Sequence, residues 1–200
     1  MREFQFSRGN RKISKDVLIW NLPRAITCRG AGECLKWCYE IKIERMYPNV
    51  RKARKRNLEF SKKKEFVEKI VEYLKRRKEK IIRLHESGDL YDQEYLDKWK
   101  EIARQLPEKQ FYAYTKSFDL DLWTNLPPNF NLIQSYGSKY DHLIDEKKAT
   151  ARVIKDIRER KPFEFICPEQ LAKKKDKEIK CMRECKLCLR KNIHVAFLLH

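Results

Sequence analysis

Seven cysteines are the residues of this chain whose type and spacing most clearly indicate chemistry. They fall into a first group, Cys28, Cys34 and Cys38, and a second group, Cys167, Cys181, Cys185 and Cys188. Thiolates are ligands of iron–sulfur clusters and of zinc, and thiols in the cytosol stay reduced instead of forming disulfides. The cysteine pattern therefore predicts an intracellular protein with two metal-binding groups.

The first group places three thiols within residues 28–38, on a loop that runs into a helix reaching about Met46. Three local thiolates can hold a [4Fe–4S] cluster and leave one iron open for a small ligand. Arg29 and Lys36 favour thiolate formation and offset the negative charge of a cluster. We expect Trp37, next to Cys38, to shield sulfur from water.

The second group offers four thiolates, enough to saturate a [4Fe–4S] cluster or a tetrahedral zinc ion. Structural zinc sites usually pair two C-x2-C knuckles, and only Cys185 and Cys188 have that spacing here. The sequence thus favours one or two iron–sulfur clusters, with zinc left open as the alternative. His200 at the end of the last expected strand is a further candidate ligand.

Short apolar runs alternate with amphipathic stretches along most of the chain. Strands are expected at Val17–Trp20, Lys80–Leu84, Gln110–Tyr114, Phe130–Gln134, Phe163–Ile166 and His194–Leu199. Helices are expected at Leu58–Glu79, from a cap at Asp92 to Pro107, and near Ala149–Lys161. Such alternation predicts an α/β fold with a parallel sheet, an open or partial (β/α) barrel over residues 1–166. Residues 167–200 would be a cysteine-rich metal-binding extension packed on the same domain.

Ligands of parallel α/β folds bind at the carboxyl ends of the strands, so the loops after Leu84, Tyr114, Gln134 and Ile166 should share one face. We expect both cysteine groups to converge at this shared end of the sheet. Candidate ligand-binding residues in these loops are Ser87, Gly88, Asp89, Lys116, Ser117 and Ser135, with His85 beside them. Asp89 and Lys116 are the candidates for catalytic roles, and a helix-capping role for Asp89 is equally open.

Positive charge is concentrated in one part of the chain. The net charge is +18, and residues 42–80 contain sixteen Lys and Arg against six Asp and Glu. The candidate nucleic-acid contacts are Arg51, Lys52, Arg54, Lys55 and Arg56. A solvated helix face explains the run equally well, because Lys- and Glu-rich surfaces are typical of thermophile proteins. Any such binding should depend on salt and little on base sequence.

Other function classes have weaker support in the sequence. The longest apolar runs, such as Val195–Leu199, are far too short to span a membrane. Residues 1–15 have no apolar segment typical of a secretory signal, which favours the cytoplasm. A metal-assisted nuclease would need clustered carboxylates, and Glu86, Asp89 and Asp92 are the only suggestive set. The oligomeric state is left open.

Several motifs together resemble the "gene product 88" family of phages and archaea, which implies a virus or plasmid source. They are Thr27–Tyr39 with its three cysteines, Arg83–Asp89, Phe111–Ser117, the terminal cysteines and Val195–His200. The layout is more distantly similar to radical S-adenosylmethionine (SAM) enzymes, although C-x5-C-x3-C replaces their usual C-x3-C-x2-C. That similarity implies SAM bound at the first cluster, with Ser87, Gly88 and Asp89 near its amino group.

The resemblance leaves two functions open. One is an iron–sulfur enzyme, radical-SAM-like, that acts on nucleic acid or a phosphorylated ligand. The other is a non-catalytic nucleic-acid-binding protein whose zinc or iron–sulfur sites only stabilise the fold.

Overall fold

The computed structural model describes residues 3–36, 38–174 and 177–199. Its strands are β1 (Phe6–Arg8), β2 (Val17–Trp20), β3 (Ile81–Leu84), β4 (Gln110–Thr115), β5 (Phe130–Ser135), β6 (Thr150–Ile154), β7 (Phe165–Ile166) and β8 (His194–Leu198). Its α-helices are α1 (Glu40–Met46), α2 (Pro48–Ser61), α3 (Phe66–Lys75), α4 (Gln93–Gln105) and α5 (Pro168–Lys174). Short 3-10 turns are η1 (Glu33–Leu35), η2 (Asp141–Leu143), η3 (Ile157–Glu159) and η4 (Leu187–Leu189).

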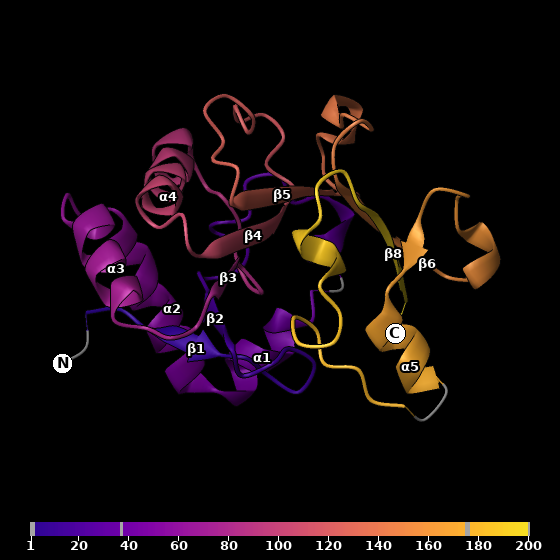
Figure 1. Ribbon diagram of the computed structural model, residues 1–200, viewed down its shortest axis with the longest axis horizontal. Helices are drawn as coiled ribbons and strands as arrows, with labels where there is room; N and C mark the ends of the chain where they lie inside the picture. The colour runs from indigo at the N-terminus through magenta and orange to yellow at the C-terminus, as the bar shows by residue number, and fades with distance from the viewer. Residues whose placement is uncertain (1–2, 37, 175–176, 200) are drawn as a thin grey trace.

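The strands form one eight-stranded sheet in the order β1-β2-β3-β4-β5-β6-β8-β7 (Figure 1). The short strand β1 pairs antiparallel with β2, and the neighbouring strands after it pair in parallel. The mixed α/β class and the mostly parallel sheet predicted from the sequence are therefore confirmed. β8 lies between β6 and β7, so the last strand belongs to the same sheet as the first.

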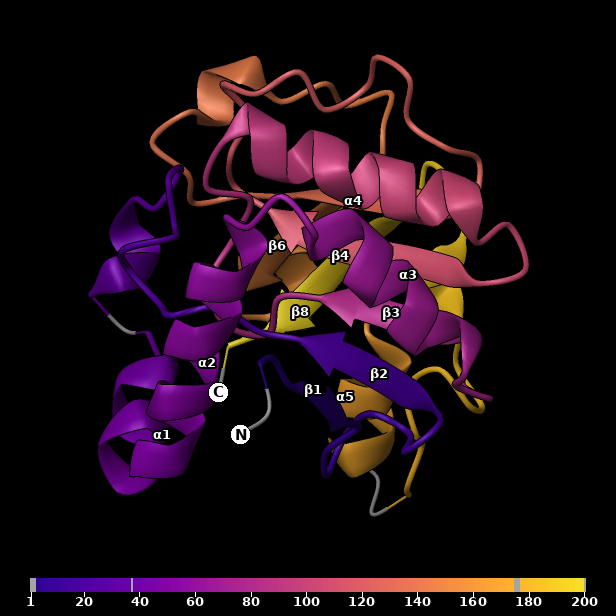
Figure 2. The same cartoon turned by 90° about the vertical axis from the view of Figure 1, so that its left-hand side faces the viewer.

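Side chains of the strands alternate between two faces of the sheet. Leu18, Trp20, Ile82 and Leu84 point to the face covered by α3 and α4, which Figure 2 shows in front of the strands. We call this the helix face. The other side of the strands, which we call the opposite face, carries residues such as Ile19 and is covered by the C-terminal cysteine segment.

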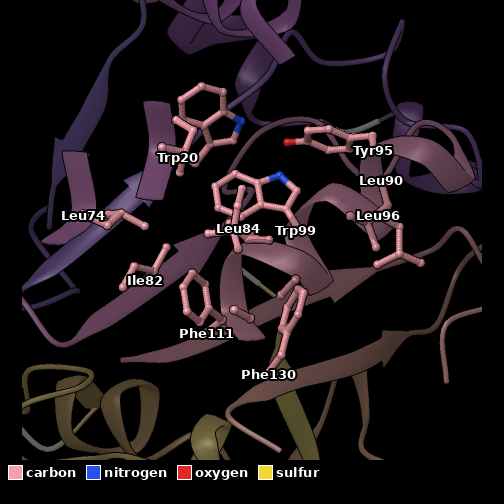
Figure 3. Packing of buried hydrophobic residues seen from close by; sticks show 14 of the residues in the cluster. Trp20, Leu74, Ile82, Leu84, Leu90, Tyr95, Leu96, Trp99, Phe111 and Phe130 are labelled. Atoms are coloured by element: carbon pink, nitrogen blue, oxygen red, sulfur yellow. The ribbon is translucent and has the colours of Figure 1, made fainter. Parts of the chain in front are cut away.

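The core on the helix face is rich in aromatic residues (Figure 3). The rings of Trp20 and Trp99 pack edge-on with centroids 5.8 Å apart, and Phe66 packs against Trp99 at 5.6 Å. Each fully buried large side chain contributes roughly 1.5–3 kcal/mol of transfer free energy. This packing fixes β2 and β3 under the two helices, and with them the loops that follow each strand.

Two helix predictions differ from the structure. The expected helix Leu58–Glu79 is divided into α2, which begins earlier at Pro48, and α3, which begins at Phe66. The expected helix near Ala149–Lys161 is wrong, because that region forms β6 and the short turn η3. Thr150, Val153 and Ile154 are β-branched and suit a strand, whereas the local charge had suggested a helix.

The start of α4 agrees with the sequence. The Asp92 carboxylate accepts a hydrogen bond from the Tyr95 backbone N–H at 2.8 Å, as expected of an N-cap. None of the described helices is long and apolar enough to cross a bilayer.

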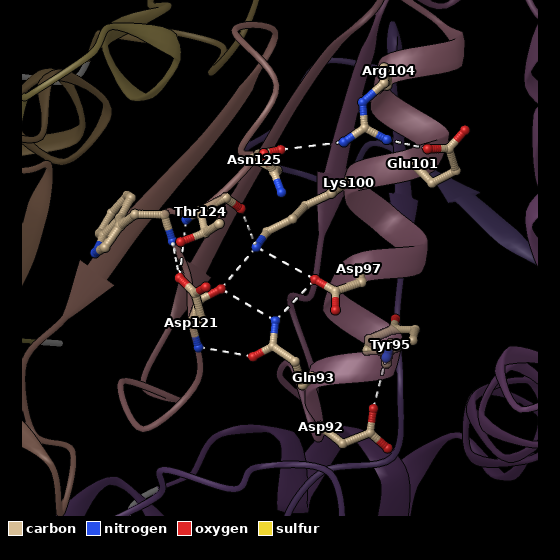
Figure 4. A network of polar contacts seen from close by, with 11 residues as sticks. Asp92, Gln93, Tyr95, Asp97, Lys100, Glu101, Arg104, Asp121, Thr124 and Asn125 are labelled. Carbon is tan, nitrogen blue, oxygen red and sulfur yellow. Dashed lines mark hydrogen bonds and ion pairs between the residues drawn. The ribbon is translucent and has the colours of Figure 1, made fainter.

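A buried lysine joins α4 to the turn that follows β4 (Figure 4). Lys100 is 3% exposed, and its Nζ donates to the carbonyl oxygens of Asp121 at 2.8 Å and Thr124 at 2.9 Å. We expect Lys100→Met to lower the free energy of unfolding by about 2 kcal/mol, because charged hydrogen bonds are lost from a buried position. Urea denaturation measures this, with Arg104→Met as control. Arg104 pairs with Glu101 on the exposed side of α4, so its variant should change stability by less than about 1 kcal/mol.

Candidate metal and ligand site

The first cysteine loop is fixed to the carboxyl ends of β4 and β5. The Gly30 carbonyl accepts hydrogen bonds from Ser138 Oγ at 2.8 Å and from the Lys139 N–H at 3.2 Å. Ala31 also forms an antiparallel bridge with Ser138. A Cβ atom on Gly30 would lie 1.7 Å from the carbonyl oxygen of Lys116, so only glycine allows this close approach.

The Ser-Gly-Asp loop after β3 packs against the residues that begin the same cysteine loop. Asn21 Oδ1 accepts hydrogen bonds from the N–H groups of Glu86 at 2.7 Å and Ser87 at 3.1 Å. Gly88 has a φ of +83°, and a Cβ there would lie 2.6 Å from Thr27 Oγ1. The glycine of the motif therefore serves the turn and the tight packing of the two loops, and its neighbours Ser87 and Asp89 are buried.

Asp89 connects the loop after β3 to the end of β4. Its two carboxylate oxygens accept from the backbone N–H of Leu90 at 2.7 Å and of Lys116 at 2.8 Å. Burial raises the pKa of Asp89 to about 6, against the opposing effect of these hydrogen bonds. Asp89 does not cap α4, since Asp92 does so.

Lys116 and Ser135 also meet at this edge. Lys116 Nζ donates to Ser135 O at 2.9 Å and Ser135 Oγ at 3.0 Å, and also to the carbonyl of Tyr136. Burial lowers the pKa of Lys116, and the nearby charges of Cys34 and Asp89 oppose that effect. The structure thus brings Ser87, Asp89, Lys116 and Ser135 to one end of the sheet, next to the first cysteine group.

Two hydroxyl groups at this edge are buried without hydrogen-bond partners. Ser87 is 3% exposed and Ser117 is 0% exposed, and within the described part of the chain neither Oγ has a partner. A buried hydroxyl without a partner costs about 1–3 kcal/mol, which a bound ligand or water relieves. Together with His85 Nδ1, they are buried polar atoms near this edge that have no partner among the described residues.

The first cysteine group consists of three free, half-buried thiols. Burial, together with repulsion from Asp89, Cys34 and Cys38, raises the pKa of Cys28 to about 12. The three sulfur atoms are therefore electrostatic neighbours, and a bound cationic centre would stabilise their thiolate forms. Trp37 lies outside the described residues.

The second cysteine group is also gathered in space. The Cys167 and Cys181 side chains hydrogen-bond each other, which lowers the pKa of Cys167 to about 7 and raises that of Cys181. Cys185 and Cys188 act on Cys181 by charge, and Cys181 and Cys185 form a β-bridge. Tyr114 Oη donates to Cys188 Sγ at 2.7 Å.

The second group lies only in part at the expected end of the sheet: Cys167 directly follows the carboxyl end of β7, whereas Cys181 and Cys188 contact the amino ends of other strands. The Cys181 N–H donates to the Lys12 carbonyl at 3.0 Å, just before β2 begins, and Asn131 Nδ2 donates to the Cys188 carbonyl at 2.8 Å near the start of β5. Cys181 and Cys188 pack with Tyr112 on the opposite face of the sheet. The two groups are thus separate candidate centres. His200 lies outside the described residues.

The donor set of both groups suits iron–sulfur clusters and zinc, since free thiols gather without disulfides. Among the described residues, no three Cys, His, Asp or Glu side chains already stand in a metal-ligating arrangement. Binding would therefore need rotation of the cysteine side chains toward a common centre. Six of the seven are half-buried, and Cys167 is buried.

The basic run on α2 divides between surface and interior. Arg51, Lys52 and Lys55 are exposed and Arg56 is partly exposed. Arg54 is 4% exposed and pairs with Glu40 at 2.5 Å and Glu44 at 3.1 Å. In this fold Arg54 is not exposed for the expected contact with nucleic acid, because it is buried and its charge is paired with two carboxylates of α1.

Sequence reasoning missed Arg83 and Tyr114 on the opposite face. The Arg83 guanidinium lies 5.8 Å from the Tyr114 ring centre and 3.6 Å from the Glu86 carboxylate. Arg83 is followed two positions later by His85, at the edge that carries the site. The available signal was the alternation of side chains along β3. Ile82 and Leu84 face the helices, so Arg83 between them must point to the opposite face.

His85 should make stability depend on pH. It is 4% exposed, Nε2 lies 3.0 Å from Tyr95 Oη, and burial, followed by the charge of Arg83, lowers its pKa to about 3. Between pH 6.5 and 3 the unfolded chain binds a proton that the folded chain excludes, so stability falls as pH falls. Between pH 7 and pH 5, the protonation of His85 in the unfolded chain should lower the free energy of unfolding by about 2 kcal/mol.

Urea denaturation of wild type and His85→Asn at both pH values measures this difference. Asn tolerates the positive φ of 63° at position 85. The contribution of Asp89 to the pH dependence has the opposite sign, because its raised pKa adds stability as pH falls. Asp89 is present in both proteins, so its contribution cancels in the comparison. Equal pH slopes for wild type and variant would show that His85 is not held neutral in the fold.

The fold and the site together define an α/β protein with a mostly parallel sheet and free cysteines gathered in two groups. Residues 4–195 match the model of the Gene product 88 family, and the chain belongs to that family. It is similar to the Gene 88 protein of Mycobacterium phage L5, at 29% identity over 94 residues. The match covers 42% of this chain and 39% of that relative, so it spans less than half the relative's length. No solved structure matches the chain.

Proposed function

We propose that this protein binds an iron–sulfur cluster through Cys28, Cys34 and Cys38, and a second metal centre through the four C-terminal cysteines. The observation that carries the proposal is the first cysteine loop, which holds three neighbouring free thiols at the ligand-binding end of a parallel sheet. Three thiolates suit a [4Fe–4S] cluster with one open iron. Zinc remains the alternative at the second group, where four thiolates suffice for a tetrahedral site.

The protein is proposed to act as a radical-SAM-like enzyme with this cluster and SAM as cofactors. When bound, the cluster would supply one-electron chemistry. The chain's own contribution is positional: Asp89 fixes the backbone at Lys116, and Lys116 holds the loop after β5. The unpartnered hydroxyls of Ser87 and Ser117 support a polar ligand at this edge. Of these two serines, Ser87 alone belongs to the Ser-Gly-Asp motif, which is expected to lie near the SAM amino group.

The curvature of the sheet is proposed to be that of a partial barrel. Helices α3, α4 and α5 cover the same side of the strands, since Ala196 and Leu198 pack under α5 on that side and Val195 points to the other. The C-terminal cysteine segment then occupies the opposite face, as an extension over the inside of the arch (Figure 1). We propose the cytoplasm as its location, because the thiols must stay reduced.

The test is anaerobic purification followed by optical titration. Absorbance near 400 nm that bleaches with dithionite supports the cluster. SAM binding can then be measured by isothermal titration with wild type and Ser87→Ala, in which the variant should bind several-fold more weakly. Cluster-loaded protein that does not bind SAM would remove the radical-SAM-like part and leave the cluster.

A second candidate is a non-catalytic nucleic-acid-binding protein whose metals stabilise the fold. The exposed positions of Arg51, Lys52 and Lys55 on α2 favour it. Colourless protein with stoichiometric zinc in both groups would support this candidate over the first.

A further inference from the structure

A cavity of about 260 Å³, broadly open to solvent, lies where the loop after β2 meets α1 and the start of α2. The residues that line it are Arg24, Ile41, Glu44, Arg45, Pro48 and Arg51. Half of them are arginines, and none belongs to the cysteine groups or to the Ser-Gly-Asp loop. Arginine presents a planar fork of N–H donors that matches a phosphate group.

The cavity has an excess of positive charge. Its one carboxylate, Glu44, lies 3.1 Å from Arg54 and 3.6 Å from Arg24, so it is already paired. Arg45 and Arg51 are exposed, and in the described part of the chain no carboxylate lies within 4 Å of either. Two guanidinium groups are therefore free to bind an anion.

A buried ion pair holds the walls of the cavity in place. Arg54 of α2 and Glu40 of α1 lie 2.5 Å apart, with side chains 5% and 6% exposed. Their position between the two helices fixes α1 against α2, which sets the distance between Arg45 and Arg51. The backbone that carries Arg45 and Arg51 is therefore already fixed, so binding an anion has to order only their side chains.

The surface around the cavity indicates which kind of anion it binds. Tyr47 is 51% exposed and Met46 is 53% exposed, both at the junction of α1 and α2. Lys52 and Lys55 are exposed further along α2. A free aromatic face next to basic side chains is the arrangement on which unpaired bases stack while the backbone is neutralised. A duplex hides the faces of its bases and would leave Tyr47 unused.

We propose that this arginine cavity binds a backbone phosphate of single-stranded nucleic acid, with a neighbouring base stacked on Tyr47. Arg45 and Arg51 hold the phosphate, and Lys52 and Lys55 follow the strand along α2. The inference rests on the proposed function, because it gives the bound strand a role as the ligand of that site. Arg24 lies four residues before Cys28, so the bound strand would pass near the first cysteine group.

The test is fluorescence anisotropy of anaerobically purified protein with a labelled single-stranded oligonucleotide. The double variant Arg45→Ala/Arg51→Ala should bind at least about tenfold more weakly, and Tyr47→Leu about tenfold. The matched control is Lys75→Ala/Lys78→Ala, which removes the same charge from exposed positions at the end of α3 and just after it, and should change affinity less than about threefold. The slope of log affinity against log salt should fall by about 0.7 for each phosphate that the variant no longer neutralises.

Equal losses in the cavity variant and the control would overturn the proposal, because binding would then follow net charge alone. Equal affinity for the duplex of the same sequence would overturn the single-strand assignment, and absence of oligonucleotide binding would overturn the site. Free inorganic phosphate should compete only weakly. Iron content, measured in the same samples, separates the two claims: oligonucleotide binding without iron keeps this site and removes the cluster, and iron without binding does the reverse.

Discussion

Cys34→Ala should lose the iron of the first cysteine group and keep that of the second, so that total iron falls by about half when both groups hold clusters. The physical reason is local: Cys28 and Cys38 alone supply two thiolates, and His85 is buried with Nε2 against Tyr95 Oη. The fold should survive, because Cys34 is only half-buried and lies in the short turn η1, outside the described core clusters. The loss of unfolding free energy in the metal-free state should stay below about 1 kcal/mol.

The matched variant is Cys185→Ala in the second group. It should remove the other half of the metal and leave the open-iron site intact. Iron and acid-labile sulfide assays on anaerobic samples, together with the visible spectrum, measure both. If Cys34→Ala kept full iron and sulfide, the first group would not be a cluster site.

Gly30→Ala should detach the first cysteine loop from the sheet. The added Cβ would lie 1.7 Å from the oxygen and 2.3 Å from the carbon of the Lys116 carbonyl, and both are backbone atoms that no side-chain rotation can move. The loop must therefore shift, with loss of the Ser138 hydrogen bond to the Gly30 carbonyl. We expect a loss of about 2–4 kcal/mol in unfolding free energy and a lower iron content in the first group.

Gly137→Ala is the control for this prediction. Gly137 lies across the same edge, and a Cβ there would meet only Lys116 Nζ, at 3.6 Å. Its φ of +86° makes alanine strained by about 1 kcal/mol, but the cysteine loop stays docked. Thermal melts and iron assays distinguish the two variants. Wild-type stability and metal content in Gly30→Ala would show that the loop does not pack on β4 as described.

Much of the sheet could be predicted because its signals are local. The buried runs at Val17–Trp20 and Phe130–Ser135, and the cap at Asp92, depend on residue type and short spacing. β6 was missed because the charge around it outweighed three β-branched residues. The division between α2 and α3 was missed because residues 62–65, which are three lysines and a glutamate, contain no glycine or proline to mark a break in the helix.

The candidate site was partly predictable for a topological reason. Parallel strands place the loops after β3, β4 and β5 at one edge, which is why Asp89, Lys116 and Ser135 meet there. The position of the second cysteine group could not be predicted from the order of the strands. It depends on the hydrogen bond between Cys181 and Lys12, almost the whole chain apart in sequence. Arg54 shows the same limit, since its partners on α1 are visible only after folding.

The central claim is that the first cysteine group holds an iron–sulfur cluster. The most direct test is the iron and acid-labile sulfide content of anaerobically purified wild-type protein, compared with Cys185→Ala, in which a cluster can remain only at the first group. We expect brown protein with about four iron and four sulfide for each cluster, and one or two clusters per chain. Colourless protein that contains zinc and no acid-labile sulfide would contradict the claim.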